Sequence, residues 1–165
     1  MNIIEYKEQI QHPLQEATLC FLVRDGEVLL AMKKRGFAKG KFNGVGGKAN
    51  QGETIEETAT RETFEEIGVQ VENLQKVASL ECFFPENISL GQHVTVFIAK
   101  EWKGNPTETE EMDPKWFKLN EIPYENMWPD ELIWLPQVLA GKTVKAQFMF
   151  GTNDLIIDQN IEITN

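Results

Sequence analysis

The sequence predicts an α/β protein in which a mixed β-sheet lies between helices, an α/β/α sandwich. Runs rich in β-forming residues are interspersed with helical segments, without the regular alternation of βαβ units. Two pairs of these runs are joined by turn sequences, Asp25-Gly26 and Gly151–Asp154, which predicts two antiparallel hairpins. Residues 55–67 are flanked by helix-capping residues at both ends, which predicts a helix between strands.

Length and composition indicate one globular domain. The 165 residues are 41% hydrophobic and 25% charged, so we expect a single domain over residues 1–165, with residues 1–13 as a leader of unassigned role. The net charge of −10 disfavours a nucleic acid polymer or an anionic membrane as partner. Cys20 and Cys82 are too few for a disulfide scaffold, and we see no signal peptide or membrane span. We therefore expect a cytoplasmic protein.

The expected strands share high β-propensity and turn residues at their ends. In chain order they are residues 14–24, 27–34, 69–72, 76–84, 92–102, 115–119, 143–150 and 155–163. Between them lie a glycine-rich loop at 36–47, a polar loop at 104–113, and a turn or short helix at 120–127. A second helix is predicted from Pro129 to Ala140, with Pro129 at its first helical position and acids in its first turn. Pro136 is expected to shorten or kink it.

The first helix is predicted to run from Ile55 to Ile67. Thr54 and Glu57 form the pattern of a capping box, and Gly68 is a favourable residue just beyond the C-terminus. At 100° per residue, one side of this helix can face a core. That side carries Ile55, Ala59, Thr63 and Ile67.

Glu62, Glu65 and Glu66 form an acidic stripe beside that apolar side. Like charges at these spacings destabilise an exposed helix by roughly 0.2–0.5 kcal/mol per pair. Only Arg61 lies nearby, one turn from both Glu57 and Glu65, and it can pair with either. One interpretation is a solvated acidic face. The other is a site for a hard divalent cation, since Mg²⁺ binds carboxylates together with substrate phosphates.

Lys33-Lys34-Arg35 is a local cationic cluster in an acidic chain. It is either a charged strand end or a contact for phosphate. The glycine-rich loop that follows runs directly into the acidic helix, so its backbone could approach a ligand and a carbonyl could complete a metal site.

The spacing of these residues resembles the Nudix box, G-x5-E-x7-R-E-U-x-E-E-x-G-U, in which U is aliphatic. The matching residues are Gly47, Glu53, Arg61, Glu62, Glu65, Glu66, Gly68 and Val69. Thr63 departs from the pattern because it adds a hydroxyl where a bulky aliphatic residue is usual. The departure affects packing more than chemistry.

Further segments resemble the MutT-type Nudix hydrolases that act on oxidised purine nucleoside triphosphates. They are Met32–Phe37, Phe42–Gly44, Gly46–Lys48, Glu111-Met112, Trp116-Phe117 and Met127–Asp130. The similarity covers about residues 17–163. It implies an α/β/α sandwich that hydrolyses a nucleotide such as 8-oxo-dGTP to the monophosphate and pyrophosphate.

The resemblance implies a Mg²⁺ site, with Mn²⁺ as a possible substitute. Its ligands would be Glu62, Glu65, Glu66, Glu111 and the carbonyl of Gly46. We expect Glu53 to hold the loop or the outer metal shell, and Arg61 to orient the carboxylates. A carboxylate that is not consumed by the metal could accept a proton from water. Glu65, Glu66 and Glu111 remain candidates for that task.

The resemblance also implies a purine pocket. Asn43, Asp130 and Glu131 would hold the purine edge, Trp128, Phe37 and Phe84 would wall the pocket, and Thr18 and Lys33 complete the predicted substrate-binding set. Glu131 stands where the family has Asp, and Cys82 stands where it has an aromatic residue. Both departures could alter base selectivity. His93 is interpreted as a strand residue without a catalytic task.

Three functions are compatible with these patterns. The favoured one is a monomeric hydrolase of oxidised purine nucleoside triphosphates. The second is a Nudix hydrolase of a dinucleoside polyphosphate or nucleotide sugar. The presence of Asn43 and Trp128-Pro129-Asp130 disfavours it. The third is a non-catalytic nucleotide or metal sensor, which the intact set of Glu62, Glu65 and Glu66 disfavours.

Overall fold

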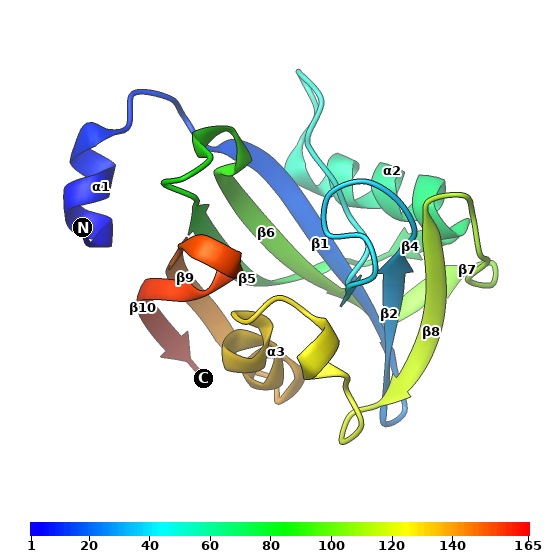
Figure 1. Ribbon diagram of the computed structural model, residues 1–165. Coiled ribbons are helices and arrows are strands. Elements are labelled where there is room, and N and C mark those ends of the chain that lie inside the picture. The colour runs from blue at the N-terminus through cyan, green and yellow to red at the C-terminus, as the bar shows by residue number, and fades with distance from the viewer.

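The computed structural model describes all residues from Met1 to Asn165, and Figure 1 shows a strongly twisted sheet with helices around it. The strands of the main sheet are β1 (Gln15–Arg24), β2 (Glu27–Lys33), β3 (Phe42–Asn43), β5 (Gln75–Phe83), β6 (Gln92–Ala99), β8 (Met112–Lys118), β9 (Thr143–Phe150) and β10 (Ile156–Thr164). Their order is β10-β9-β5-β6-β1-β2-β3, and β8 also pairs with β2. A separate two-stranded sheet joins β4 (Gln70–Glu72) to β7 (Glu101–Lys103).

The sheet is mixed, as predicted. β1 runs parallel to β6 and β5 runs parallel to β9, whereas the other pairs are antiparallel. Both predicted hairpins are present: Arg24 pairs with Glu27 across the first turn, and Phe150 pairs with Ile156 across the second. The second turn contains a short 3-10 helix at Thr152–Asp154.

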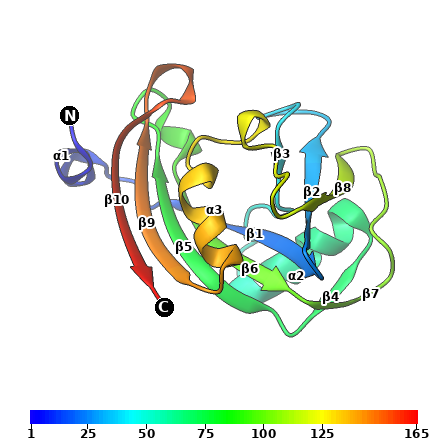
Figure 2. The ribbon, with the colours of Figure 1, turned by 90° about the horizontal axis from the view of Figure 1, so that it is seen from below.

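The helices α2 (Ile55–Ile67) and α3 (Glu131–Leu139) cover opposite faces of the sheet (Figure 2). Ala59 and Ile67 of α2 belong to one buried cluster, and Trp134 and Leu135 of α3 belong to another. Further 3-10 turns occupy Ile88–Leu90 and Tyr124–Asn126. No helix has the length and apolarity that a membrane crossing requires.

The run predicted as one strand at 92–102 is two strands, so that prediction was wrong. β6 ends at Ala99, and the chain leaves the main sheet at the exposed residue Lys100. β7 then pairs with β4 instead. The run of β-forming residues ends at Ile98, and the low β-propensity of Ala99, Lys100 and Glu101 marks the break that the prediction overlooked.

The predicted start of the second helix was also wrong. α3 begins at Glu131 rather than at Pro129, which lies in a turn. Asp130 occupies the N-cap position, yet it has helical backbone angles and its side chain makes no capping hydrogen bond. The helix continues past Pro136 and ends at Leu139.

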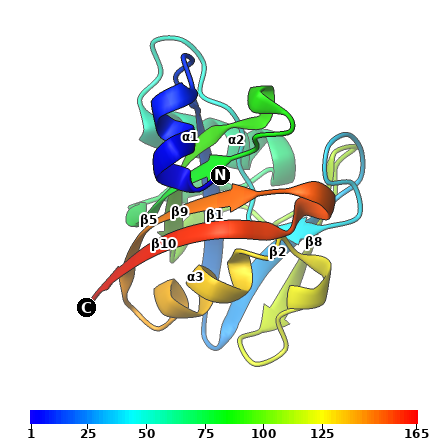
Figure 3. The same cartoon turned by 60° about the vertical axis from the view of Figure 1, so that its left-hand side comes forward.

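The leader contains a third helix, α1 (Ile3–Gln9), which the sequence interpretation left without structure. Figure 1 shows it apart from α2 and α3, and Figure 3 shows it above β9 and β10. The glycine-rich loop likewise contains the short strand β3, and β8 starts at Met112, inside the segment predicted as a polar loop.

Candidate functional site

Helix α2 has the predicted boundaries and caps. The side chain of Thr54 accepts a hydrogen bond from the Glu57 backbone, and the Glu57 carboxylate accepts one from the Thr54 backbone. Gly68 ends the helix with a left-handed backbone conformation. Because these signals are local in sequence, they fix where α2 begins and ends.

Arg61 is the centre of an ion-pair network on this helix. Its Nε lies 2.6 Å from Glu53 Oε2, and its Nη1 lies 2.8 Å from Glu62 Oε1 and 3.1 Å from Glu65 Oε2. The predicted pair with Glu65 is therefore present, and the alternative pair with Glu57 is absent because Glu57 caps the helix. Arg61 contacts three carboxylates at once and holds their orientation.

Glu53 ties the loop before α2 to the helix. Its Oε1 accepts hydrogen bonds from the Asn50 backbone and from the Thr58 hydroxyl, at 2.9 and 2.8 Å. The hydrogen bonds from Arg61, together with these two, lower the pKa of Glu53 to about 2. Glu53 is thus a permanently ionised anchor of the loop.

Glu66 is the buried member of the acidic stripe, with 5% of its surface exposed. Its Oε2 accepts a hydrogen bond of 3.2 Å from the backbone N–H of Gly46. Burial raises the pKa of Glu66 to about 8, and the negative charges of Glu62 and Glu111 act in the same direction. The Gly46 hydrogen bond and the charge of Lys33 only partly oppose this rise.

Gly46 and Gly47 lie where no side chain would fit. A Cβ on Gly46 would overlap the carbonyl oxygen of Thr18, and a Cβ on Gly47 would lie 2.5 Å from Cδ of Glu62. The Thr18 N–H donates to the Gly47 carbonyl at 2.9 Å. The glycines therefore bring the loop backbone into direct contact with both β1 and the acidic stripe of α2.

The cationic cluster at the end of β2 divides between two environments. Lys34 pairs with Glu108, and Arg35 lies 3.1 Å from Glu111. Lys33 instead lines a cavity beside the glycine-rich loop. The interpretation as a charged strand end thus describes Lys34 and Arg35, whereas only Lys33 is placed to meet a ligand.

No three acidic, His or Cys side chains converge closely enough to form a metal-binding cluster. Arg61 holds Glu62 and Glu65, and Arg35 holds Glu111. The donor chemistry nevertheless fits a hard divalent cation, because every donor is an oxygen and the desolvated carboxylate of Glu66 is surrounded by like charge. A cation at this position would lower the free energy of the ionised Glu66.

A cavity of about 270 Å³ opens beside this loop. All eight predicted substrate-binding residues line it: Thr18, Lys33, Phe37, Asn43, Phe84, Trp128, Asp130 and Glu131. Gly46 lines the cavity too, which connects it to the acidic helix. The carboxylates of α2 do not line it, so the predicted residues form two adjacent groups.

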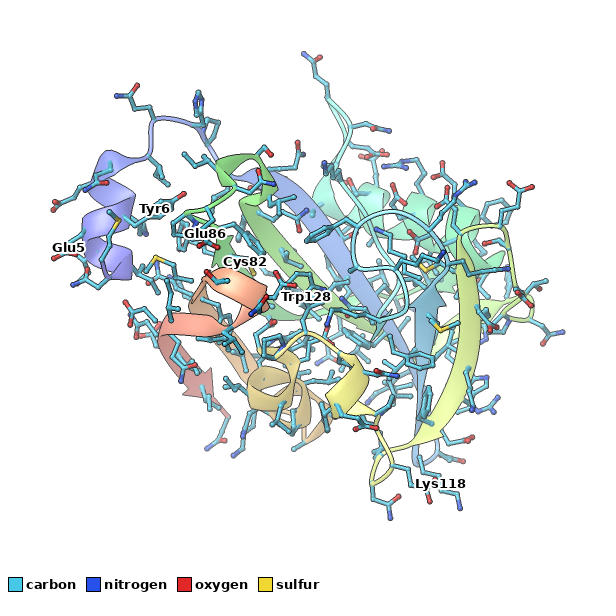
Figure 4. The ribbon with its side chains drawn as sticks, in the orientation of Figure 1. Glu5, Tyr6, Cys82, Glu86, Lys118 and Trp128 are labelled. Carbon is cyan, nitrogen blue, oxygen red and sulfur yellow. The ribbon has the colours of Figure 1, made fainter.

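Aromatic rings form one wall of this cavity. Phe84 and Phe150 are stacked with centroids 5.0 Å apart and planes at 15°. Trp128 packs on both, at 6.0 and 5.7 Å, and Phe37 lies 5.4 Å from Trp128. Such a wall fits a flat heterocycle such as a nucleobase. Figure 4 shows Trp128 and Cys82 close together in this region.

Asp130 and Glu131 lie in the cavity wall and are 6% and 1% exposed. The indole N–H of Trp134 donates to Asp130 Oδ2 at 2.7 Å, whereas Oε2 of Glu131 is buried without a hydrogen-bond partner. Burial raises the pKa of Asp130 to about 6. Burial and then the charge of Asp130 raise the pKa of Glu131 well above its usual value. The pair can hold a proton near neutral pH.

The cavity also contains residues that the sequence interpretation did not assign. Lys41 places its Nζ 5.5 Å from the Trp128 ring centroid, and its charge lowers the pKa of Glu131 against the stronger effect of burial. Phe150, Leu90 and Gln92 complete the wall. The alternation of β9 places Phe148 and Phe150 on one side of their strand, but nothing local shows that Phe150 meets Phe84.

His93 lies on the other face of the sheet, away from this cavity. Its Nε2 is 2.7 Å from Ser79 Oγ, and its Nδ1 is 2.8 Å from Glu16 Oε1. The order Ser-His-Glu resembles a nucleophilic relay. However, Ser79 and His93 lie in β5 and β6, which are paired on both sides, so no adjacent backbone N–H is free to form an oxyanion hole. The network is a cross-strand polar contact.

Comparison with known proteins gives a consistent result. The family model described as the NUDIX domain matches residues 13–138. The chain is 41% identical over 145 residues to an oxidized purine nucleoside triphosphate hydrolase of Danio rerio, covering 88% of this chain and 92% of that protein. It is 42% identical over 144 residues to the Mus musculus protein of the same name, covering 87% and 92%. The crystal structure of a MutT mutator protein from Bacillus halodurans superposes with a TM-score of 0.78 at 25% identity, covering 90% and 98%.

Proposed function

Because the chain belongs to the Nudix hydrolase family, we propose that it hydrolyses oxidised purine nucleoside triphosphates, such as 8-oxo-dGTP, to the monophosphate and pyrophosphate. This removes damaged nucleotides before a polymerase can use them. Two relatives above 40% identity carry the name oxidized purine nucleoside triphosphate hydrolase. The single observation that carries the proposal is the buried pair of Asp130 and Glu131 in an aromatic cavity beside the acidic helix.

The base end of the site offers both acceptors and a donor. A purine edge presents N–H donors and carbonyl acceptors, so recognition needs the complementary set. Glu131 Oε2 is free to accept, and a proton on the acidic pair can be donated. The Asn43 side-chain oxygen accepts from the Gly44 N–H at 2.7 Å, which leaves its NH₂ group available to donate to a base carbonyl. Oxidation changes this hydrogen-bonding pattern, and the site can therefore distinguish damaged from undamaged purines.

At the phosphate end, Glu62, Glu65, Glu66, Glu111 and the Gly46 carbonyl would hold Mg²⁺, or Mn²⁺ in its place. When bound, the ion supplies Lewis-acid stabilisation of charge on the phosphate oxygens. Arg61 keeps Glu62 and Glu65 oriented through the ion pairs described above. Lys33 lies between this end and the cavity, where its charge can meet a phosphate.

The attacking water needs a proton acceptor, and we propose that role for whichever of Glu65 and Glu111 the metal does not consume. Their side chains are 56% and 55% exposed, so water reaches both. Glu66 is buried and directed at the Gly46 N–H, which suits a ligand better than a base. The proton from the water would pass to the exposed carboxylate while the scissile phosphorus–oxygen bond breaks.

Hydrolysis of a panel of nucleotides with Mg²⁺, with all products separated and identified by chromatography, tests the function. The panel contains 8-oxo-dGTP, 2-hydroxy-dATP, dGTP, a dinucleoside polyphosphate and a nucleotide sugar. We expect the highest kcat/KM on an oxidised purine triphosphate, and none when chelator is in excess. Preference for the dinucleoside or the nucleotide sugar would favour the second hydrolase activity. Tight binding without turnover of any substrate would indicate a sensor.

We further propose that the enzyme acts as a monomer in the cytoplasm. Cys20 and Cys82 are both free thiols, which suits a reducing compartment. The substrate is a small molecule, and a chain of net charge −10 has little attraction for a nucleic acid polymer.

A further inference from the structure

Helix α1 packs on the sheet through two of its seven residues. Ile3 and Tyr6 are 3% and 6% exposed and form a separate buried cluster with Phe83 and Met149. The rings of Tyr6 and Phe83 meet edge to face, with centroids 5.7 Å apart. Figure 4 shows Tyr6 directed toward the strands, whereas Glu5 points away from them. A helix this short is marginal on its own, so docking on the sheet determines its position.

Polar contacts fix α1 to two strands. The backbone N–H of Ile3 donates to Asp158 Oδ2 of β10 at 2.8 Å. Lys7 lies 3.6 Å from Glu81 of β5. The helix is therefore held at both ends as well as through its apolar side.

Helix α1 packs against two buried residues, and each of them is followed in the sequence by a residue of the cavity wall. Phe83 precedes Phe84, and Met149 precedes Phe150. Because successive side chains of a strand point to opposite faces, α1 contacts the back of the two segments whose front carries the stacked pair Phe84–Phe150. A displacement of either backbone would move a cavity ring.

The residues after α1 contact a third part of the wall from behind. Ile10 and Leu14 pack against the same buried cluster. The Gln15 N–H donates to the Gly91 carbonyl at 3.1 Å, and Gly91 lies between Leu90 and Gln92, which both line the cavity. The N-terminal segment thus supports three separate pieces of one wall.

We propose that residues 3–14 position the base-binding wall and set the affinity for the purine, an inference that rests on the proposed function. Tyr6 and Ile3 are positioning residues, since neither lines the cavity. The acidic helix α2 belongs to a different buried cluster, so the phosphate chemistry is independent of α1. Loss of α1 packing should raise KM for the oxidised nucleotide and leave kcat near its normal value.

The test compares neighbouring residues of one helix. Ile3→Ala removes a buried contact, whereas Ile4→Ala is its matched control because Ile4 is 74% exposed. Tyr6→Ala is compared with Tyr6→Phe, which keeps the ring. We measure kcat and KM for 8-oxo-dGTP with Mg²⁺, and the Kd of the product 8-oxo-dGMP by calorimetry. Small displacements in a binding site can cost up to about 10²-fold, and we expect KM and Kd to rise about 10-fold for Ile3→Ala and Tyr6→Ala only.

A stability control separates positioning from general weakening of the fold. Leu74→Ala truncates a side chain that packs on the cluster of α2, far from α1. Even if Leu74→Ala lowers Tm as much as Ile3→Ala and Tyr6→Ala do, it should leave KM and Kd at wild-type values. The proposal is overturned if Ile3→Ala and Tyr6→Ala lower Tm but leave KM and Kd unchanged, or if Leu74→Ala raises them equally. If the wild type prefers another nucleotide, the proposed function fails. The same comparison on that nucleotide and its product then still tests the role of α1.

Discussion

The backbone N–H of Gly46 donates a hydrogen bond to Oε2 of the buried Glu66, at 3.2 Å. This contact joins the glycine-rich loop to the acidic helix, at the point where the cavity and the carboxylates meet. It stabilises the ionised carboxylate, yet burial still raises the pKa of Glu66 to about 8. The site therefore holds a carboxylate that the protein alone does not fully compensate.

Glu66→Gln should lower Mg²⁺-dependent turnover by about 10²-fold or more, as is typical for the loss of a positioned catalytic group. The amide keeps the size of the side chain and can still accept from the Gly46 N–H, so the fold should survive. The matched control is Glu56→Gln, an exposed acid in the first turn of the same helix. Steady-state kinetics check both variants. Near-normal turnover by Glu66→Gln would remove Glu66 from the metal site.

The stability of the metal-free enzyme should fall as pH rises from about 4.5 to 8. The folded protein binds a proton at Glu66 across this window, between its usual pKa of 4.5 and about 8, whereas the unfolded chain has lost it. Asp130 acts in the same direction at lower pH, since burial raises its pKa from 3.8 to about 6. In thermal unfolding with chelator present, the Tm of Glu66→Gln should fall less with rising pH than the Tm of the wild type.

Above pH 8, added Mg²⁺ should restore the stability that the metal-free wild type has lost. The reason is that a ligand that binds only the folded state stabilises it by mass action. The Tm of Glu66→Gln should respond much less. An equal Mg²⁺ response in both proteins would contradict the assignment of Glu66 as a ligand.

Features that depend on residues close together in the sequence could be predicted from it. Features that depend on contacts between distant residues could not. Helix α2 is predicted to the residue because Thr54, Glu57 and Gly68 act within its own turns. The ion pair of Arg35 with Glu111 joins residues 76 positions apart, and no local pattern reveals it. Helix α1 also has a local signal, the capping box of Asn2 and Glu5, but seven residues are marginal as an isolated helix and their order depends on a distant surface. The cavity residues were found through the resemblance, since they come from segments across the whole chain.

Replacing each of the exposed carboxylates, Glu65 and Glu111, by an amide should identify the proton acceptor. If Glu111 has this role, Glu111→Gln lowers kcat by about 10²-fold or more, as is typical of a lost general base, and it also releases Arg35. Arg35→Ala breaks the same ion pair but keeps the carboxylate, and it is the matched control. Glu65→Gln is tested in parallel. Rate–pH profiles decide between them, because loss of the base removes the acidic limb. If both variants keep that limb, the acceptor lies elsewhere.

Thr63→Val should be nearly neutral, whereas Thr63→Leu should destabilise the fold by about 1–3 kcal/mol through overpacking. From the sequence alone, Thr63→Leu is expected to be tolerated and even stabilising, because leucine would add buried apolar area. However, Thr63 is completely buried, and its hydroxyl donates to the Ala59 carbonyl at 2.7 Å within the helix. Valine keeps the shape and leaves a carbonyl that the helix already satisfies. Denaturant unfolding of both variants checks this, and a Leu variant as stable as the wild type would reveal unfilled space.

Asp130→Asn should impair recognition of the oxidised base far more than hydrolysis itself. One alternative is that Asp130 is only a helix-end acid, but its side chain makes no capping bond and is buried against Trp134. The Trp134 indole can only donate, so the oxygen of the introduced amide must face it, and the NH₂ group is then directed elsewhere. A carboxylate that could accept from a purine N–H is thereby replaced by a donor.

The mispaired donor should lower kcat/KM for 8-oxo-dGTP by up to about 10⁴-fold, the range seen when a buried hydrogen-bond pattern fails. The loss on undamaged dGTP should be much smaller, because the wild-type site does not match its edge. The Mg²⁺ concentration for half-maximal rate should not change, since Asp130 lies in the cavity group and not among the α2 carboxylates. Asp25→Asn, in the exposed turn between β1 and β2, is the control for the substitution itself. Equal losses on both nucleotides, or none, would return Asp130 to a structural role, because only a group that reads the base distinguishes the two substrates.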